Sequence, residues 1–380
     1  MRTYDVVVVG GGIIGRLSAW RLAARGLRTA ILEQGETGGQ ATAAAAGILS
    51  PSAEGLEAGT LYRFMRWSLE ETRALREELE ADAARSLGWR REGVLQTAVT
   101  PERLDLLRRR FAWLREEDPS VRWVDGSEAR ELEPALSSAT LGGIWAPEES
   151  QLLAVAFSDA AARAAVRRGA DLIQGAVVTA LTVQRGRVTG VESSAGPFAA
   201  AYTVLAAGAW SGLLAAGIGL ALPLEPVKGH ILALQQTRPL FRSVVFGDGI
   251  YLVPKDDGRL IVGATEERVG FDSRVTAAGL LRLLEPMPRV APGLADLPWA
   301  SAWTGFRPKS PDELPYLGPV ATHPGLVVAT GHYRHGILLA AGTARLVAET
   351  VQGQDPGFPL ADMRPDRFRE AGEPLPVSAW

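Results

Sequence analysis

Three glycines near the N-terminus have the spacing that a phosphate-binding turn requires. The pattern is Gly10-x-Gly12-x-x-Gly15, and it follows a short β-branched run that ends at Val9. Gly10 permits a tight turn, Gly12 lets the backbone approach a pyrophosphate, and Gly15 lets the next helix pack close to the strand. Free N–H groups at the start of that helix then face the phosphates. The pattern therefore predicts a dinucleotide site.

An acidic residue lies where such a site needs one. Glu33 ends the second predicted strand, about twenty residues beyond the glycines, and a carboxylate there accepts hydrogen bonds from ribose hydroxyls. The same negative charge repels a 2′-phosphate, which argues against NADP. The glycine motif and Glu33 do not by themselves distinguish FAD from NAD.

Three later segments favour FAD over NAD. Residues 38–48 read GGQATAAAAGI, a nearly side-chain-free surface on which a flat ring system can lie. Residues 203–211 read TVLAAGAWS, an apolar strand ending in small residues, so that backbone can pass the dinucleotide again. Residues 331–339 read GHYRHGILL, a polar loop that opens a helix. A helix N-terminus aimed at the flavin N1–C2=O edge would stabilise the negative charge of the reduced ring.

The composition excludes several other kinds of chemistry. The 380 residues include no cysteine, which rules out disulfides, thiolate metal sites, a cysteine nucleophile and a flavin tethered through sulfur. The four histidines are not spaced as metal ligands, and no metal site is expected. A net charge of −3 gives no basic surface for nucleic acid.

The hydropathy pattern contains no membrane segment and no N-terminal signal peptide. No apolar run free of charges reaches the length of about eighteen residues that a transmembrane helix needs. The chain starts with a strand-like run instead of a basic region followed by an apolar one. We therefore expect a cytoplasmic protein with no integral membrane segment.

The order of predicted elements indicates two interleaved domains. Residues 4–9, 14–25 and 28–33 alternate as strand, helix and strand, and their parallel strands need the crossover helix. Further helices are predicted over 61–82, 101–117, 152–168, 276–288 and 336–351. Strands are predicted within 171–205, 224–264 and 299–306.

The predicted fold class is α/β with α+β character. An FAD-binding Rossmann-like domain is expected over residues 1–82, 148–218 and 318–380. An antiparallel-sheet substrate domain is expected over residues 83–147 and 219–317.

The linked order of eight motifs carries a resemblance to a known family. The motifs are GGGIIG at 10–15, AAAAGILSP at 43–51, AAGAWSG at 206–212, PVKG at 226–229, YLVP at 251–254, GFRP at 305–308, LPYLG at 314–318 and GHYRHGILLA at 331–340. In this order they resemble the D-amino acid oxidase and sarcosine oxidase superfamily of FAD proteins, and within it the glycine oxidases of the thiamine pathway. The resemblance runs from Tyr4 to about Val351.

Together, the motifs and the resemblance imply FAD that is held non-covalently. Val178 matches a position whose backbone meets the adenine. The predicted cofactor contacts are Gly10, Gly12, Ile13, Ile14, Gly15, Glu33, Gln34, Thr42, Ala43, Ala46, Gly47, Ile48, Val178, Ala207, Gly208, Trp210, His332, Tyr333, Arg334, His335, Gly336, Ile337 and Leu338.

The resemblance also implies a substrate site for a small amino acid. Arg307 matches the arginine that grips the substrate carboxylate, Tyr251 matches a tyrosine whose hydroxyl assists it, and Arg334 matches a second substrate-side position. A carboxylate in a dry pocket needs a compensating charge, and arginine offers two parallel hydrogen bonds that also fix its orientation.

The implied reaction is oxidative deamination of glycine, sarcosine or small D-amino acids. A hydride passes from Cα to flavin N5, which requires the two atoms to lie within about 3–3.5 Å. No acid or base side chain is needed if the amine is neutral, because the cofactor carries the chemistry. The imine then hydrolyses to a 2-oxo acid and ammonia or an amine, and oxygen is reduced to hydrogen peroxide. Such an enzyme could feed thiamine biosynthesis.

Three departures from the family pattern bear on the substrate. His335 stands where the family more often has asparagine, and Gln40 where glycine oxidases often have arginine. The bulk of residues 48–51 helps to set the size of the substrate site. These positions leave the prediction of FAD intact and weaken that of the substrate.

Two other functions remain open. One is a dehydrogenase that passes electrons to a quinone or a partner protein and docks on a membrane through residues 277–284, although Arg282 and the short length favour a buried helix there. The other is an FAD-binding subunit without independent catalysis, against which Tyr251 and Arg307 argue. The expected partners are a small amino acid and oxygen, and a homo-oligomer is suggested by analogy alone.

Overall fold

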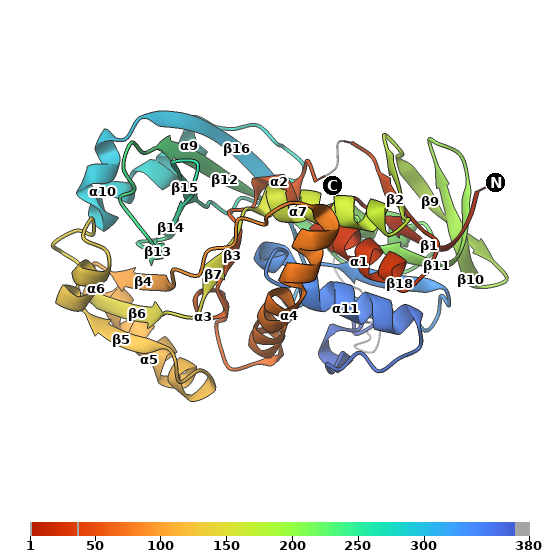
Figure 1. Cartoon of the computed structure of the whole chain (residues 1–380), viewed down its shortest axis with the longest axis horizontal. Coiled ribbons are helices and arrows are strands. Elements are labelled where there is room, and N and C mark those ends of the chain that lie inside the picture. Colours follow the sequence, from red (N-terminus) through yellow and green to blue (C-terminus); the bar gives the residue numbers. More distant parts are fainter. Residues whose placement is uncertain (1, 36–37, 369–380) are drawn as a thin grey trace.

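Two large β-sheets lie at opposite ends of the molecule (Figure 1). The computed structural model describes residues 2–35 and 38–368. Each large sheet has eight strands within this described part, and a third sheet of two strands, β3 (Ile48–Leu49) and β7 (Ser150–Gln151), lies between them (Figure 1).

The first sheet is built around five parallel strands. Their order is β8 (Asp171–Gln174), β2 (Thr29–Glu33), β1 (Arg2–Val9), β11 (Phe198–Leu205) and β18 (Leu326–Thr330). Antiparallel strands extend it, namely β17 (Tyr316–Pro319), β10 (Arg187–Ser193) and β9 (Val178–Gln184). All five residues of β2 are buried, as expected of a parallel strand covered on both faces.

Four helices pack together beside this sheet: α1 (Ile13–Ala24), α4 (Thr60–Ala83), α7 (Ala154–Arg167) and α11 (Ala340–Val351). The buried positions of α4 recur every three or four residues, at Met65, Leu69, Thr72, Leu75 and Leu79. That spacing forms one apolar face, which joins the core below α1 and α11.

The second sheet is mostly antiparallel. Its order is β16 (Trp299–Lys309), β12 (Glu225–Gln235), β15 (Arg259–Gly263), β14 (Ile250–Pro254), β13 (Val244–Gly247), β4 (Val94–Ala98), β6 (Gly142–Ala146) and β5 (Arg122–Asp125). The pair β13 and β4 is parallel and joins two distant parts of the chain. Around it lie α5 (Pro101–Glu117), α6 (Gly126–Leu132), α9 (Ala277–Leu284) and α10 (Met287–Val290).

The expected mixed α/β fold is confirmed, with several local corrections. The single helix predicted over 276–288 is two helices, because Pro286 cannot continue α9. The helix predicted over 336–351 begins at Ala340, after a 3-10 turn (η3, Tyr333–His335). The predicted domain boundary after residue 317 falls inside β17, and the domain limits stay a prediction; residues 369–380 of the first domain lie outside the described residues.

The helix α9 is amphipathic, which corrects the expectation that it is buried. Gly279 and Leu283 face the protein, whereas Leu281 is 53% exposed. Gly279 has no side chain because a Cβ there would lie 2.4 Å from the ring of His230. None of the described helices is both long and apolar enough to cross a membrane.

A buried carboxylate just before β7 binds the chain segment that follows β3. Glu149 accepts hydrogen bonds from the backbone N–H of Ser52 at 2.6 Å, from its hydroxyl at 2.7 Å and from the hydroxyl of Ser50. Burial raises the pKa of Glu149 to about 7, although these donors oppose the shift. The native state therefore holds a proton that the unfolded chain releases at lower pH.

We predict that Glu149→Gln makes the free energy of unfolding less dependent on pH. In the wild type the unfolded state binds fewer protons than the native state between about pH 4.5 and 7, so stability falls as the pH rises through this window. This contribution is at most about 3 kcal/mol and is absent from the amide variant. Urea unfolding from pH 5 to 8 measures it, with the exposed Glu192→Gln as control. If the free energy of unfolding depends on pH in the same way in the wild type and in Glu149→Gln, Glu149 does not have the raised pKa assigned to it.

Candidate active site

A cavity of about 670 Å³ is lined by residues of both large sheets. It runs from the glycine turn after β1 to the side chains of β14 and β16. The predicted site residues that line it are Gly10, Gly12, Ile13, Ile14, Glu33, Gln34, Thr42, Ala46, Gly47, Ile48, Val178, Ala207, Gly208, Trp210, Tyr251, Arg307, His332, Tyr333, Arg334, His335, Gly336, Ile337 and Leu338.

Two predicted residues, Gly15 and Ala43, are not among the residues that line the cavity. A Cβ on Gly15 would lie 2.0 Å from the carbonyl oxygen of Gly10, so Gly15 serves the close packing of α1 on β1. Ala43 belongs to α2 (Ala41–Ala44), a single helical turn, and its side chain is exposed while Thr42 and Ala44 are buried. Successive helical side chains diverge by about 100°, which turns Ala43 outward.

The glycine turn presents free donors to the cavity. Gly10 has φ +107°, and a Cβ on it would lie 2.4 Å from the carbonyl oxygen of Ala206. Thr42 accepts a hydrogen bond from the N–H of Ile13 at 3.1 Å. Within the described residues the N–H groups of Gly12 and Ile14 donate to no protein acceptor. This end can therefore bind a pyrophosphate.

Glu33 lies at the end of β2 and lines the same part of the cavity. Its Oε2 accepts a hydrogen bond from the N–H of Gly11 at 2.6 Å, and its Oε1 accepts one from the N–H of Gly35 at 3.0 Å. Each oxygen keeps a further lone pair, so the carboxylate can also receive ribose hydroxyls.

The middle of the cavity is lined by backbone and small side chains. Gly47 has φ +80°, and a Cβ on it would lie 2.0 Å from the carbonyl oxygen of Leu152. Nearby, the indole of Trp303 donates to the carbonyl oxygen of Ala44 at 3.2 Å, which holds α2 against β16. A flat ring system can lie against this surface without meeting bulky side chains.

The loop after β18 adds neutral imidazoles and unpaired N–H groups. Burial lowers the pKa of both His332 and His335 to about 3, so both rings are uncharged at physiological pH. His332 makes a 2.9 Å hydrogen bond with the hydroxyl of Thr343. Among the described residues no acceptor is found for the N–H groups from Gly336 to Leu338. The sequence predicted that these donors belong to the start of a helix. They belong instead to the turn that precedes α11.

Arg307 and Tyr251 lie at the other end of the cavity, each opposite a glycine. A Cβ on Gly229 would lie 2.5 Å from the Arg307 guanidinium, and a Cβ on Gly263 would lie 2.4 Å from the Tyr251 hydroxyl. Desolvation raises the pKa of Tyr251 to about 12, so its hydroxyl stays a donor. The two glycines make room for the two side chains that the resemblance assigns to the substrate.

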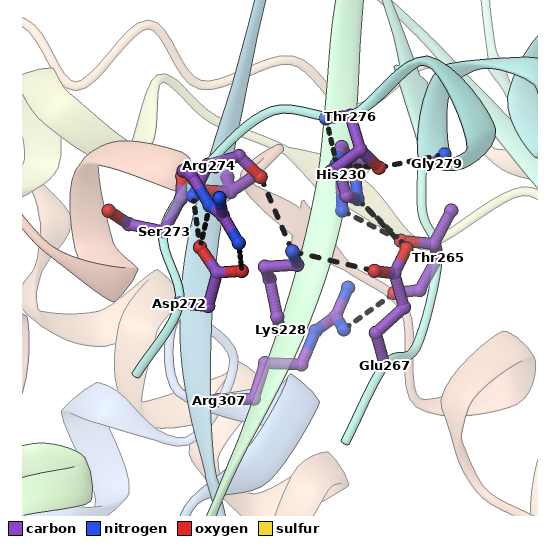
Figure 2. A network of polar contacts seen from close by, with 11 residues as sticks. Lys228, His230, Thr265, Glu267, Asp272, Ser273, Arg274, Thr276, Gly279 and Arg307 are labelled. Atoms are coloured by element: carbon purple, nitrogen blue, oxygen red, sulfur yellow. Dashed lines mark hydrogen bonds and ion pairs between the residues drawn. The ribbon is translucent and has the colours of Figure 1, made fainter. Parts of the chain in front are cut away.

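Behind Arg307 a polar network fixes the carbonyl group that receives it. Figure 2 shows Arg307 donating to the backbone oxygen of Thr265, at 2.9 Å. The hydroxyl of Thr265 accepts from the N–H of His230 at 2.9 Å and donates to Glu267 at 3.1 Å. The ring of His230 lies 3.0 Å from Glu267 through Nδ1 and accepts from the N–H of Thr276 through Nε2. This segment therefore orients the guanidinium.

Arg334 also lines the cavity, but two carboxylates already share its charge. Its guanidinium lies 3.3 Å from Glu54 and 3.6 Å from Glu266. Burial works against the charge, yet these carboxylates raise the pKa of Arg334 above its ordinary value. Arg334 is consequently less free than Arg307 to receive a substrate carboxylate.

Several cavity residues were not predicted from the sequence. Glu54 and Glu266 line the cavity, but no local pattern in the sequence marks them. Gly229 and Gly305 stand inside recognised motifs, where a glycine in a strand signals a close approach. A Cβ on Gly305 would lie 2.5 Å from the side chain of Ala44.

The comparisons with known proteins agree with this geometry. A family model described as DAO, FAD dependent oxidoreductase, matches residues 5–350. The chain belongs to this family. It is 38% identical, over 94% of its own length and 95% of the other protein, to the glycine oxidase of Geobacillus kaustophilus strain HTA426. A crystal structure of glycine oxidase from Geobacillus kaustophilus matches with a TM-score of 0.92 and 37% identity, covering 97% of this chain and 99% of that one.

A second kind of relative is larger than this chain. The bifunctional protein ThiO/ThiG of Nostoc sp. strain PCC 7120 is 34% identical over 99% of this chain, which covers 57% of that protein. As a DAO-family protein the chain is an FAD-dependent oxidoreductase, and FAD fits the free N–H groups and the glycine-lined walls of the cavity. The described residues contain no group of three that could hold a metal ion.

We predict that Glu33→Gln weakens FAD binding about tenfold. The amide loses the charge that strengthens hydrogen bonds from the ribose and from the N–H of Gly11, a loss of about 1.5 kcal/mol. Reconstitution of the apoprotein, followed by flavin fluorescence, measures the dissociation constant. Glu192→Gln, an exposed change in the same sheet, should leave the constant unaltered. Unaltered binding by Glu33→Gln would mean that the carboxylate serves only the turn.

Proposed function

We propose that this DAO-family protein is an oxidase of small amino acids, of the glycine oxidase type. The proposed substrates are glycine, sarcosine and small D-amino acids, with oxygen as electron acceptor. Support comes from the glycine oxidases among its relatives and from the charge at the far end of the cavity.

The observation that carries this proposal is the state of Arg307. Its side chain faces the cavity, and its one hydrogen bond in the described structure goes to a neutral carbonyl group, that of Thr265. None of the described carboxylates forms an ion pair with it. A charged guanidinium without an acidic partner favours an anionic ligand, and the carboxylate of an amino acid offers the matching pair of oxygens.

The residues around Arg307 position the substrate. They supply no acid or base, so the reaction requires that the substrate amine is neutral. Tyr251 adds a neutral donor to the carboxylate, since its hydroxyl stays protonated. FAD, held by the glycine turn and Glu33, would supply the acceptor for the hydride from Cα and for the transfer of electrons to oxygen. His332 and His335 are uncharged, so they add no charge to the part of the cavity that they line. The fixed guanidinium orients Cα toward the middle of the cavity, where backbone and small side chains leave room for a flat ring system.

Peroxide formation by the purified holoenzyme in air tests the proposal directly. Glycine, sarcosine, D-alanine and D-proline are supplied one at a time. Peroxide from glycine or sarcosine supports the oxidase. Flavin bleaching without oxygen, but no peroxide in air, supports the dehydrogenase alternative. If none of the four amino acids gives peroxide or bleaches the flavin, the amino acid oxidase is refuted. The alternative of an FAD-binding subunit would then remain.

Arg307→Ala should raise the KM for these amino acids about 100-fold. The change removes a charge-assisted hydrogen bond pair, which contributes about 2–3 kcal/mol in a desolvated site. The variant should keep its bound flavin, seen in the visible spectrum, since Arg307 lies away from the glycine turn that holds the pyrophosphate. Steady-state kinetics measure the effect, with the exposed Arg282→Ala as control. Loss of flavin from Arg307→Ala would show that the residue is misplaced.

The pH profile of kcat/KM should report the ionisation of the substrate amine, because neither cavity histidine titrates near pH 6.5. His332 and His335 have pKa values of about 3 and are neutral from pH 6 upward, while Tyr251 stays protonated up to about 12. We therefore expect log kcat/KM to rise with pH until the substrate amine is deprotonated. A break near pH 6.5 that disappears in His335→Asn would contradict the neutral imidazole.

Three further proposals concern the pathway, the location and the oligomeric state of the protein. A role in thiamine biosynthesis is supported by the likeness to the bifunctional ThiO/ThiG protein. The cytoplasmic location and a homo-oligomeric state stay predictions from the sequence and from the resemblance. Size-exclusion chromatography with light scattering tests the homo-oligomeric state.

A further inference from the structure

Helix α5 places two arginines on the wall of the cavity. Arg103 and Arg110 are seven residues apart, which is two helical turns, so they share one face of α5. The helix start is fixed by Thr100, whose hydroxyl accepts from the N–H of Arg103 at 3.3 Å, and by Pro101 at its first position. Both guanidinium groups thus belong to the same region of the cavity.

Neither arginine has an acidic partner within ion-pair distance in the described structure. Arg110 donates through Nη2 to the carbonyl oxygens of Ala53 and Gly55, while its buried Nε has no hydrogen-bond partner. The Nε of Arg103 is likewise buried and unpartnered. Asp248 is close enough to favour the charge of Arg103, but its carboxylate forms its ion pair with Arg289.

Both side chains nevertheless stay charged at neutral pH. Burial lowers the pKa of Arg110 to about 10, with Glu54 opposing the shift. Burial also lowers the pKa of Arg103, and Asp248 opposes that shift. A guanidinium that keeps its charge with a buried, unpartnered Nε and no described carboxylate within ion-pair distance is costly, and an anion in the cavity would offset this cost.

The charges at the substrate end of the cavity exceed what one carboxylate can neutralise. Apart from Glu33 at the ribose end, the charged side chains that line the cavity are Arg103, Arg110, Arg307, Arg334, Glu54 and Glu266. Both glutamates pair with Arg334, and four arginines against two glutamates leave a net charge of +2. Glycine or sarcosine with a neutral amine brings one negative charge, and one positive charge is then left over.

Arg110 links this charge to the reacting end of the cavity. Its guanidinium interacts electrostatically with Glu54 and Arg334, and the same two residues influence Tyr251. The bonds of Arg110 to Ala53 and Gly55 also hold the segment that carries Glu54. The two arginines of α5 therefore face the substrate region and not the pyrophosphate turn.

We propose that Arg103 and Arg110 form a second anion subsite, which binds an anionic group on the nitrogen or side chain of the substrate. The substrate class is then a small amino acid with two carboxylates, one on Arg307 and the other on the arginines of α5. This inference rests on the proposed function, because it assumes that Arg307 receives the first carboxylate. The simplest probe with a secondary amine is iminodiacetate.

The test compares iminodiacetate with its monoamide, which has nearly the same shape and lacks the second charge. For the wild-type holoenzyme, kcat/KM should be at least tenfold higher for the diacid, since a charge-assisted hydrogen bond contributes about 1.5–3 kcal/mol. In Arg103→Gln this ratio should fall toward one. Arg109→Gln changes an exposed neighbour on the same helix and should keep the wild-type ratio.

Two outcomes would overturn the subsite. One is equal use of the diacid and the monoamide by the wild type. The other is an Arg103→Gln variant with the wild-type ratio. Arg110→Lys keeps the positive charge on an ammonium group with three donors, so this variant should still prefer the diacid. Glycine and sarcosine, assayed alongside, separate the two proposals. If they are oxidised while the diacid is not preferred, only the subsite fails; if no amino acid is oxidised, the proposed function fails.

Discussion

The close contact of backbone with backbone around Gly10 is the constraint on which the cofactor end depends. The turn after β1 lies against Ala206, just after β11, on one side and against Gly15 of α1 on the other, and a side chain at Gly10 or Gly15 would collide with a carbonyl oxygen. Because the backbone is so tightly placed, the N–H groups of Gly12 and Ile14 are left pointing at the cavity with no protein acceptor. The packing of the parallel sheet thereby creates the donors for a pyrophosphate.

The substrate end depends on a different balance, between charge and burial. Arg307 is held by a carbonyl oxygen instead of a carboxylate, and the network of His230, Glu267 and Thr265 sits behind that carbonyl and away from the cavity. The geometry of the guanidinium is thus fixed while its charge remains available. Had Glu267 paired with Arg307 directly, the ligand would have to displace an existing ion pair.

Local patterns were sufficient to predict the glycine turn and most residues that line the cavity, but not the charged side chains at its substrate end. The β-branched run before Gly10 and the acidic end of β2 are close in sequence, so the turn, the strand and Glu33 could be placed together. Ala43 does not line the cavity because a single turn of helix rotates it outward, and α11 starts later than predicted because a 3-10 turn over Tyr333–His335 precedes it. Neither effect can be seen in composition or spacing.

The cavity charges were missed for another reason. Arg103 and Arg110 belong to an amphipathic helix full of charges, where most arginines are exposed to solvent, and only the docking of α5 beside β4 separates them from their neighbours. Glu54 and Glu266 meet at Arg334 although they are distant in the chain. Pairings of this kind follow from tertiary contacts, which one sequence does not reveal.

The parallel pair of β13 and β4 has a consequence for how the chain folds. Val244 pairs with Val94, so this contact closes a loop of 150 residues, and the second sheet stays in two pieces until β13 has been synthesised. Loop closure over such a separation is entropically costly and slows folding. The helix α5 lies on one piece and the strand β16 on the other, so the binding site for the substrate can be assembled only after the intervening strands and helices of the first sheet have been made.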